Sequence, residues 1–449
     1  MKSETAKVLH PVGGRPMLAY LLDLAEDVDA SRTVVVVGHQ AEAVRAFVGK
    51  RAASALQDPP RGTGDAARCA LAVLPKFTGV IVILNGDTPL LRSSNVRSML
   101  DAHRASQSAL SVAVTRLASP AGYGRVLRDS GGGIMGIVEE RDATDEQRTM
   151  CEINAGVYVA EAAFLRAALT ELKADNAQGE YYLTDIVGLA AAQGRAVRAY
   201  DIDRDDVIGV NSRADLAHVE RLMRMRICER WMDAGVTILD PSRTWIDSTV
   251  TIGRDSVLAP GAWLEGATTV GETCVIGAGS HLIASRLGDG VVIKDHCVME
   301  GAQIDDGATV GPFAHLRPGS VLRRGAKVGN FVELKRAELG IGAKANHLSY
   351  LGDAAIGAHV NVGAGTITCN YDGIKKSRTI VEDNVFVGSD SQLIAPVRIG
   401  KGAVIAAGTT VTEDVPANAL AIGRVKPVVK ANWASRRRGG ARRTKRGTR

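Results

Sequence analysis

Residues 251–282 read TIGRDSVLAPGAWLEGATTVGETCVIGAGSHL, and an aliphatic residue stands at every sixth position of this stretch. These positions are Ile252, Leu258, Leu264, Val270, Ile276 and Leu282. A sustained six-residue period is typical of a parallel β-helix, in which three hexads close one triangular coil and the aliphatic side chains fill its interior. An antiparallel β domain with evenly spaced strands has no need of this period, so the stretch favours a β-helix.

The six-residue series resumes twice further along the chain. Its later positions are Val292, Val298, Ile304, Val310, Leu316, Leu322, Val328 and Leu334, then Val381, Val387, Leu393, Ile399, Ile405 and Val411. The series predicts a β-helix of roughly ten coils over residues 250–425, each coil contacting only its neighbours. We expect the two phase breaks, 283–291 and 368–380, to be loops that leave the helix. Because insertions in repeat proteins commonly bind ligands, the segment 361–380 is a candidate site.

Residues 6–211 show a different pattern, in which short β-branched runs alternate with amphipathic helical segments. The runs predict buried strands at 34–38, 80–87, 111–115 and 157–160, and the helical segments lie at 17–27, 65–74, 183–192 and 211–234. This alternation predicts an α/β, Rossmann-like domain with a mostly parallel sheet. Ligands bind at the carboxyl ends of the strands in such sheets, which is where Asp87 stands.

The patterns divide the chain into four segments. We expect an α/β domain at 1–212, a helical linker and lead-in at 213–249, the β-helix at 250–425 and a basic tail at 426–449. The net charge of the 449 residues is +6, but the last fifteen contain eight basic residues and no acidic one, so the rest of the chain carries −2.

The arginine-rich tail is the one feature that suggests a nucleic-acid-binding protein, because basic segments bind phosphates. Its sequence, SRRRGGARRTKRGTR, has no aromatic side chain on which a base could stack. Blocks of like charge are usually disordered and solvated. We therefore expect a disordered tail and do not expect nucleic acid as a partner.

Composition narrows the class of protein further. The sequence has no apolar run of the roughly 20 residues that a membrane span needs, and its start has no apolar core of a secretory signal. The six cysteines lie far apart, without a C-x-x-C pair, which favours free thiols over disulfides or a zinc cluster. We expect a cytoplasmic protein that does not bind membranes.

Several motifs occur together with the hexapeptide repeat. They are GGRPM (13–17), RGTGDA (61–66), LNGDTPLL (84–91), GYGR (122–125), VEERDAT (138–144), EINAGVY (152–158), NAQGEYYLTDI (176–186), GVNSR (209–213) and NYDG (370–373). Between about Ala6 and Arg424, the chain closely resembles the bacterial bifunctional N-acetylglucosamine-1-phosphate uridylyltransferase/glucosamine-1-phosphate acetyltransferase family. The resemblance implies a nucleotidyltransferase domain followed by a left-handed parallel β-helix, with products used in cell-wall and lipopolysaccharide precursor synthesis.

For the first domain, the resemblance implies transfer of UMP from UTP to N-acetylglucosamine 1-phosphate, with release of pyrophosphate. Asp87 and Asn211 would hold Mg²⁺, and a carboxylate and an amide oxygen suit that cation. By spacing alone, Asn211 would more often be the N-cap of the following helix, and it is the GVNSR motif that favours the metal role. The other matched positions would contact the phosphates (Lys7), the uracil (Gln57, Gly62 and Thr63) and the sugar (Gly124, Glu139 and Asn154, with Asn211 completing the nucleotide site).

For the second domain, the resemblance implies acetylation of glucosamine 1-phosphate by acetyl-CoA. His347 would be the base, since an imidazole with a pKa near 6.5 can accept the proton of the attacking amine. The matched positions for the sugar phosphate are Arg317, Lys335, Tyr350 and Asn361, and those for acetyl-CoA are Ala364, Asn370, Tyr371, Ser389, Ala407 and Arg424. Ala364, Ser389 and Ala407 could also be plain corners of the helix. The resemblance further implies a homotrimer with sites between subunits.

The sequence departs from the family pattern at its start. The family's strand and phosphate loop, L-A-A-G-x-G-T-R-M, would precede Lys7, but Met1 stands where its methionine falls, and Ala6 replaces a proline. We expect the natural start about twenty residues upstream, and two unpaired strand edges in the chain as given. Its first domain would then be poorly folded and inactive, because unpaired buried backbone groups cost about 1–3 kcal/mol each. Asn346 also replaces a glycine beside His347.

Two other enzyme readings remain open from the sequence. The first is a sugar-nucleotide pyrophosphorylase whose β-helix is only structural, a layout shared by ADP-glucose and GDP-mannose pyrophosphorylases. The second is an acetyltransferase alone. His347 and the NYDG motif favour acetyl transfer, because a purely structural helix has no need of either.

Overall fold

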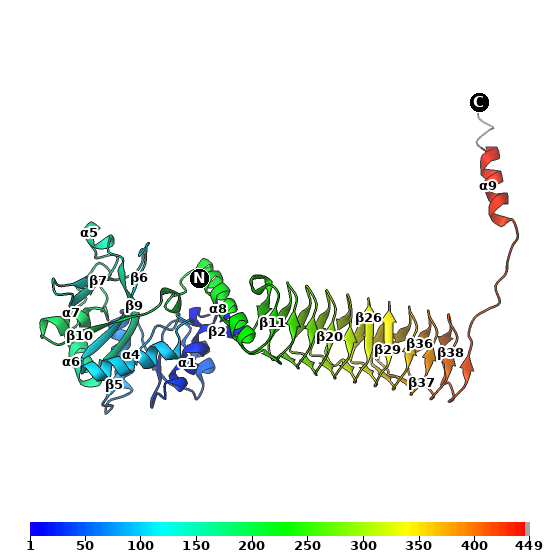
Figure 1. Cartoon of the computed structure of the whole chain (residues 1–449), viewed down its shortest axis with the longest axis horizontal. Coiled ribbons are helices and arrows are strands. Elements are labelled where there is room, and N and C mark those ends of the chain that lie inside the picture. The colour runs from blue at the N-terminus through cyan, green and yellow to red at the C-terminus, as the bar shows by residue number, and fades with distance from the viewer. Residues whose placement is uncertain (445–449) are drawn as a thin grey trace. The chain divides into compact units, whose positions relative to one another are not determined.

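The computed structural model describes residues 1–444, and the side chains of residues 1–438 (Figure 1). The chain forms two compact units. The first contains Met1–Arg230 and Ile246–Thr249, and the second contains Trp231–Trp245 and the chain from Val250 onward. No helix in the described part of the chain is long and apolar enough to cross a bilayer.

The first unit is built on a mixed sheet of six strands within the described residues. Its order is β10 (Val197–Asp201), β6 (Leu110–Arg116), β9 (Glu152–Glu161), β7 (Arg125–Arg128) and β8 (Ile134–Val138), with β5 (Val80–Ile83) also on β9. Strands β5, β6 and β10 run in one direction, because β10 pairs parallel with β6 and both β5 and β6 pair antiparallel with β9. Strand β7 pairs antiparallel with both β8 and β9, so the prediction of a mostly parallel sheet is wrong for all pairings of this sheet except that of β10 with β6.

Helices cover both faces of this sheet, with α1 and α4 on one face and α3, α6 and α7 on the other. The helices up to Asp233 are α1 (Met17–Asp27), α2 (Ala41–Val48), α3 (Thr63–Ala72), α4 (Ser93–Ser106), α5 (Asp145–Arg148), α6 (Ala162–Glu171), α7 (Asp185–Ala192) and α8 (Arg213–Asp233). Alternate residues of β6 point to opposite faces: Val112 packs with α6 and α7, whereas Ala113 packs with α1 and α4. The predicted helices at 17–27, 65–74, 183–192 and 211–234 are therefore confirmed to within a few residues.

Strands β3 and β5 of the first unit each have one unpaired edge. Among the described residues, β3 (Val34–Val37) pairs only with β4 (Ala53–Leu56), and β5 pairs only with β9. Val34 to Val36 and all four residues of β5 are half-buried, so the prediction of fully buried strands is wrong here. Because β4, β8 and β10 also pair on one side only within the described range, these edges do not test the expectation of a missing strand.

The second unit is a left-handed parallel β-helix (Figure 1). Within residues 1–444 its three sheets contain eleven, ten and nine strands; we call them the first sheet (β11 to β40), the second sheet (β12 to β39) and the third sheet (β13 to β37). Leu258, Leu264 and Ile276 are fully buried inside it, as the period predicts. The coils begin before residue 250, because β11 (Thr237–Ile238) and β12 (Trp245–Ile246) already pair with the next coil, β11 with β14.

The first phase break is not a loop, contrary to the prediction. Trp263 pairs with His281, and His281 pairs with Val298, so the second of these coils is simply one residue shorter. As a result Ile293 and Met299 are fully buried, while Val292 and Val298 are only half-buried. The assignment of Val292 and Val298 to the interior is therefore wrong.

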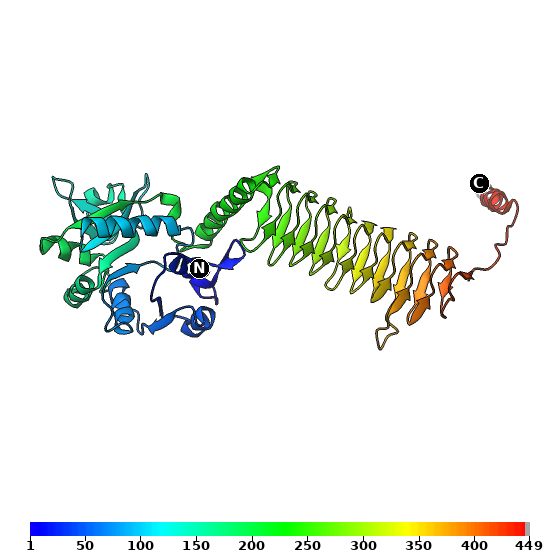
Figure 2. The ribbon, with the colours of Figure 1, turned by 60° about the horizontal axis from the view of Figure 1, so that its bottom comes forward.

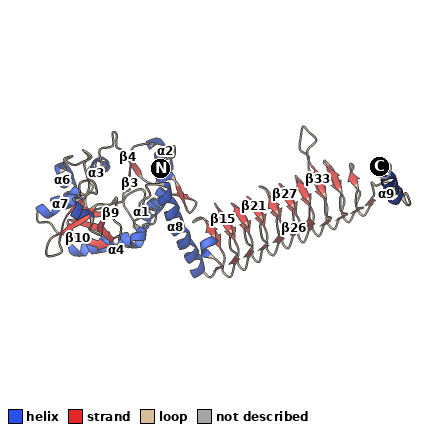
Figure 3. Ribbon diagram, turned by 90° about the horizontal axis from the view of Figure 1, so that it is seen from above, coloured by secondary structure: helices blue, strands red, loops and turns tan. Residues whose placement is uncertain are grey.

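The second phase break is a loop, as predicted. Residues 370–378 leave the helix between β33 (Ile367–Cys369) and β34 (Thr379–Val381). Figure 3 shows the excursion beside β33, and Figure 2 shows a loop that projects from the later coils of the helix. The tail contains a helix that the sequence did not predict, α9 (Trp433–Thr444). The last five residues of the predicted disordered tail lie outside the described residues.

Candidate active sites

The predicted metal ligands of the first unit meet on one cation. Lys7 Nζ lies 2.5 Å from Asp87 Oδ2, just after β5, and 2.9 Å from Asn211 Oδ1, just before α8. The two oxygens thus form a small electronegative site that already holds an ammonium group, and its donor set fits a divalent cation. The described residues contain no cluster of three or more His, Cys, Asp or Glu side chains, so a metal here would keep ligands from substrate or water.

The cap of α8 settles the alternative role of Asn211. The N-cap side chain is Ser212, whose Oγ accepts a hydrogen bond from Asp215 N at 3.1 Å. In return, Asp215 Oδ2 accepts from the backbone N–H groups of Ser212 and Asn211, at 2.8 and 3.0 Å. The Asn211 side chain is therefore not needed as a cap and is directed at the cation position.

The three predicted sugar contacts lie together. The backbone N–H of Asn154 donates to Gly124 O at 2.9 Å, and a Cβ on Gly124 would lie 3.5 Å from Glu139 Oε2. Thr184 Oγ1 donates to Glu139 Oε1 at 3.0 Å. Burial raises the pKa of Glu139, although the hydrogen bond from Thr184 opposes the shift. A half-desolvated carboxylate of this kind can accept hydrogen bonds from sugar hydroxyls.

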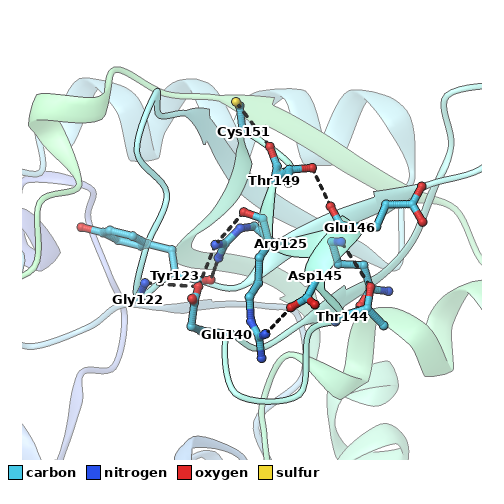
Figure 4. Close-up of polar contacts among 11 residues, drawn as sticks. Gly122, Tyr123, Arg125, Glu140, Thr144, Asp145, Glu146, Thr149 and Cys151 are labelled. Carbon is cyan, nitrogen blue, oxygen red and sulfur yellow. Dashed lines mark hydrogen bonds and ion pairs between the residues drawn. The ribbon is translucent and has the colours of Figure 1, made fainter.

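A buried arginine holds the loop that carries Gly124 (Figure 4). Arg125 is 1% exposed, and its Nη2 lies 2.7 Å from Glu140 Oε2, while its Nη1 donates to Tyr123 O. Gly122 N also donates to Glu140 at 3.3 Å. The ion pair with Arg125 lowers the pKa of Glu140. Arg125 therefore fixes the Gly122–Gly124 loop to the turn that contains Glu139.

The predicted uracil contacts also form one cluster. Gln57 Nε2 donates to Gly62 O and to Asp65 Oδ2, both at 3.0 Å, and Leu183 N donates to Thr63 Oγ1 at 3.0 Å. Gly62 has a φ of +103°, and a Cβ there would lie 2.6 Å from Tyr181 O. No other residue fits this position, so the loop before α3 presents its backbone without a side chain in the way.

In the second unit, the predicted base has a defined tautomer. His347 ends β29 (Lys344–His347), and its Nδ1 lies 2.9 Å from Asn330 Oδ1 in the preceding coil, at the end of β26 (Lys327–Asn330). Because an amide oxygen only accepts hydrogen bonds, Nδ1 carries the ring proton and donates a hydrogen bond to Asn330 Oδ1. Nε2 of the exposed imidazole keeps its lone pair and can accept a proton from a substrate.

Three predicted acetyl-CoA positions continue the column that starts at His347. The strand registers place Ala364, Ser389 and Ala407 at the same corner in the three following coils. Gly408 N donates to Ser389 O at 2.8 Å, and Arg424 Nη1 donates to Ala407 O at 2.9 Å. This corner, between the first and second sheets, presents small side chains that let a ligand approach the backbone.

The sugar-phosphate residues line the second sheet. Arg317 follows β24 (His315–Leu316), Lys335 ends β27 (Glu333–Lys335), and Tyr350 begins β30 (Tyr350–Gly352). Arg317 Nη1 contacts Glu333 Oε1 at 3.0 Å. The ammonium of Lys376, from the 370–378 loop, lowers the pKa of Lys335, with a smaller contribution from desolvation and Arg317. Three cations on one face are suited to a phosphate.

One chain does not bring all of the predicted acetyltransferase residues together. Asn361 begins β32 (Asn361–Val362) in the first sheet, whereas Arg317, Lys335 and Tyr350 belong to the second sheet. Asn370 and Tyr371 lie at the opposite edge of the second sheet from His347, at the start of the 370–378 loop. The predicted residues are thus divided between two faces and two corners of the prism.

Three residues in these sites were missed from the sequence: Asn330, Lys376 and Arg125. Asn330 stands one coil before His347, so a register of the coils could have identified it. Lys376 lies in the loop already marked as a candidate site, but its contact with Lys335 depends on how the loop folds back. Arg125 belongs to the GYGR motif, where its complete burial was not apparent.

The folds and sites of the two units define the class of protein: an enzyme in which a nucleotidyltransferase domain is joined to a hexapeptide-repeat acyltransferase domain. Residues 1–177 match the MobA-like NTP transferase domain, and residues 378–413 match the hexapeptide repeat of succinyl-transferase.

Curated relatives extend the match to almost the whole chain. The bifunctional protein GlmU of Pelobacter propionicus is 49% identical over 439 residues, which cover 97% of this chain and 95% of the relative. The bifunctional protein GlmU of Geobacter metallireducens is 50% identical over 476 residues, 98% of this chain and 96% of the relative. That of Geotalea uraniireducens is 46% identical over 436 residues, 96% and 95% of the two chains. The chain belongs to the GlmU family of bifunctional proteins and is a bifunctional enzyme.

Proposed function

We propose that the second unit transfers the acetyl group of acetyl-CoA to glucosamine 1-phosphate, and that the first unit transfers UMP from UTP to N-acetylglucosamine 1-phosphate. The observation that supports acetyl transfer is the free Nε2 of His347, fixed by Asn330 at 2.9 Å. The observation that supports uridylyl transfer is the convergence of Asp87 and Asn211 on one cation.

In acetyl transfer, the amine of glucosamine 1-phosphate attacks the thioester carbonyl, and the bond from that carbon to sulfur breaks. Nε2 of His347 accepts the proton that the amine loses, and the proton is then available to the departing thiolate. Arg317, Lys335 and Lys376 would hold the phosphate, since a guanidinium fork and two ammonium groups complement its charge. The column from Ala364 to Ala407 and the loop residues Asn370 and Tyr371 would bind acetyl-CoA.

In uridylyl transfer, Asp87 and Asn211 would hold Mg²⁺, which when bound neutralises charge on the phosphate oxygens of UTP. Lys7 would leave the two oxygens and contact the phosphates. The loop of Gln57, Gly62 and Thr63 would bind uracil, while Gly124, Glu139 and Asn154 would orient the sugar. The sugar phosphate then attacks the α-phosphorus of UTP, and pyrophosphate leaves.

We also propose that the chain forms a homotrimer, supported by the division of the acetyltransferase residues between faces of one prism. A neighbouring copy would bring Asn361 or the 370–378 loop to the sheet that carries Arg317 and Lys335. We further propose that the protein acts in the cytoplasm, where UTP and acetyl-CoA are available.

The test is to assay the two half-reactions separately on purified protein. CoA release with glucosamine 1-phosphate should fall by at least about 10²-fold in His347→Ala and be unaffected by Asp87→Ala. Pyrophosphate release from UTP and N-acetylglucosamine 1-phosphate should fall strongly in Asp87→Ala and be unaffected by His347→Ala. CoA release at the wild-type rate in His347→Ala would contradict the assigned base, and pyrophosphate release at the wild-type rate in Asp87→Ala would contradict the assigned metal ligand.

A further inference from the structure

Asp353 sits at a strained corner of the β-helix, between β30 and β31 (Ala354–Ile356). Its φ is +48°, a left-handed conformation that is uncommon for residues other than glycine and tolerated by aspartate. The backbone N–H of Asp353 donates to Lys335 O at 2.9 Å, which places it directly beside the cationic face described above. Its side chain is 15% exposed.

The carboxylate of Asp353 joins two side chains. Asp353 Oδ1 lies 2.7 Å from Arg336 Nη2, and Asp353 Oδ2 accepts a hydrogen bond from Asn370 Nδ2 at 2.5 Å. Asn370 is 8% exposed. A charge-assisted hydrogen bond to a buried amide is stronger and more directional than a neutral one, so this contact holds Asn370 in one orientation.

The same residue also holds the far end of the 370–378 loop. Thr379 N donates to Asp353 O at 3.1 Å, and Ser377 N donates to Asn370 O at 2.9 Å. Asp353 therefore contacts Asn370, which begins the loop, and Thr379, which follows the loop. The hydrogen bond from Ser377 to Asn370 joins the two ends of the loop, which we call its neck. Beyond the neck the loop is exposed; Ile374 at its tip is 93% exposed.

The loop carries two groups of the proposed acetyltransferase site. Tyr371 follows Asn370 directly, and Lys376 lies against Lys335. Both help to line an open cavity of about 750 Å³, together with Arg336 and Asp353. The direction in which the neck leaves the helix decides where these two side chains stand.

We propose that Asp353 is a positioning residue for acetyl transfer: through Asn370 and Arg336 it fixes the neck of the 370–378 loop and so places Tyr371 and Lys376 at the substrates. This inference rests on the proposed function for Asn370 and Tyr371. In this role Asp353 acts through its contacts with Asn370 and Arg336 and does not itself touch either substrate.

Asp353→Ala removes the clamp and tests the proposal with two readouts. We expect kcat/KM for acetyl-CoA to fall about 10- to 100-fold, because a displacement near 1 Å in a binding group has effects of this size. We also expect faster cleavage by trypsin after Lys375, Lys376 and Arg378, all within or at the end of the loop. Asp353→Asn, which can still accept from Asn370 but loses the charge that faces Arg336, should lie between wild type and Asp353→Ala in both readouts.

Asp255→Ala is the matched control, because Asp255 is another corner aspartate with a left-handed φ of +60° and stands in the early coils, away from the loop. It should leave both readouts at the wild-type values. If Asp353→Ala does not fold, Arg336→Met removes one half of the clamp and should still accelerate cleavage of the loop.

Unchanged trypsin cleavage and unchanged kcat/KM in folded Asp353→Ala would overturn the proposal. An equal loss of kcat/KM for acetyl-CoA in Asp255→Ala would also overturn it, since corner strain alone would then explain the effect. If the wild-type protein releases no CoA, the proposed function fails, whereas the cleavage assay still decides whether Asp353 orders the loop.

Discussion

The two units assemble their sites by different means. In the β-helix, His347, Ala364, Ser389 and Ala407 reach one corner because successive coils are in register. In the α/β unit, Lys7, Asp87 and Asn211 come from three distant parts of the chain and meet only because the whole domain folds around them. A repeat thus builds a site by local pairing, and a single globular domain builds one by long-range packing.

The units also differ in how completely their strands are paired. Each interior coil of the β-helix is bonded to a coil on both sides, and Leu334, Leu351 and Ile293 are fully buried. In the first unit, β3 and β5 each have one unpaired edge within the described residues, and the side chains of β5 are half-exposed. We therefore expect the β-helix to be the more stable unit.

The largest expected effect tests whether the two sites are chemically independent. His347→Ala should lower kcat for acetyl transfer by about 10²- to 10⁴-fold, the usual contribution of a general base. His359→Ala is the matched control, because His359 is an exposed histidine at another corner of the helix. Release of CoA and of pyrophosphate should be measured on the same preparations. A parallel loss of pyrophosphate release in His347→Ala would show that the two sites are coupled.

The contrast between a repeat and a globular domain also explains what could be predicted from sequence. The six-residue period predicted the β-helix and the 370–378 loop, since both follow from local spacing. It failed at Val292 and Val298, because each stands next to another apolar residue, Ile293 or Met299, and the period does not show which of the two points inward. Because one coil is a residue shorter, Ile293 and Met299 point inward in place of Val292 and Val298.

Long-range features were harder to predict. The antiparallel direction of β9 depends on its neighbours in the sheet and leaves no mark on its own sequence. Only the contact of Ser212 with Asp215 shows that the Asn211 side chain is not needed as a helix cap. Asn330 and Lys376 each act through a residue of another coil or loop, which local motifs do not record.

A second prediction compares the cores of the two units. Leu351→Ala, in the fully paired β-helix, should lower the free energy of unfolding by about 2–5 kcal/mol, the cost of a cavity in a close-packed core. Ile83→Ala, on the half-exposed strand β5, should cost less than about half as much, because water already reaches part of that side chain.

The chain allows the two units to be followed separately in urea. Trp245 (β12) and Trp263 (β15) lie on the β-helix, whereas Trp231 lies near the end of α8 and Trp433 begins the tail helix, so a chain with Trp231→Phe and Trp433→Phe has fluorescence that reports on the β-helix. The helical circular dichroism signal comes mainly from α1 to α8 of the first unit. Equal losses in the two variants, or an α/β unit that unfolds after the β-helix, would contradict the proposed difference in stability.

A third prediction concerns the register contact between Asn330 and His347. Asn330→Ala removes the acceptor of the Nδ1 proton, so we expect kcat for acetyl transfer to fall about tenfold, as when a partner that orients a catalytic imidazole is lost. Asn330→Asp keeps an acceptor for the Nδ1 proton, so its kcat should stay closer to the wild-type value than that of Asn330→Ala. Asn346→Ala is the control, because Asn346 is the neighbour of His347 in sequence. A kcat in Asn330→Ala equal to the wild-type value would show that this contact does not orient the imidazole.

The smallest expected effect contrasts the pH dependence of the two units through one carboxylate in each. Burial raises the pKa of Glu139 in the first unit. A carboxyl group with a raised pKa binds its proton more tightly in the folded chain than in the unfolded chain. The ionised carboxylate therefore destabilises the fold fully at pH values above the raised pKa, and this destabilisation disappears at acidic pH, where the group is protonated. Glu139→Gln should therefore stabilise the first unit at pH 7, by no more than about 1 kcal/mol in the free energy of unfolding, and so raise its melting temperature. The same substitution should have less effect near pH 4.

Glu382 in the β-helix should show the opposite sign. The backbone N–H of Lys401 donates to Glu382 Oε2 at 2.9 Å, and Arg398 Nη1 lies 2.5 Å from Glu382 Oε1. These contacts lower its pKa, with the bond from Lys401 as the larger cause, so the stability they provide is present at neutral pH and is lost as the pH falls through the folded pKa. Glu382→Gln should lower the melting temperature of the second unit at pH 7, and this effect should shrink as the pH falls below the ordinary glutamate pKa and through the lowered one. If both Glu139→Gln and Glu382→Gln lowered the melting temperature at pH 7, burial would not be the main influence on the pKa of Glu139. Its carboxylate would then be stabilised by hydrogen-bond partners, as Glu382 is by Lys401 and Arg398.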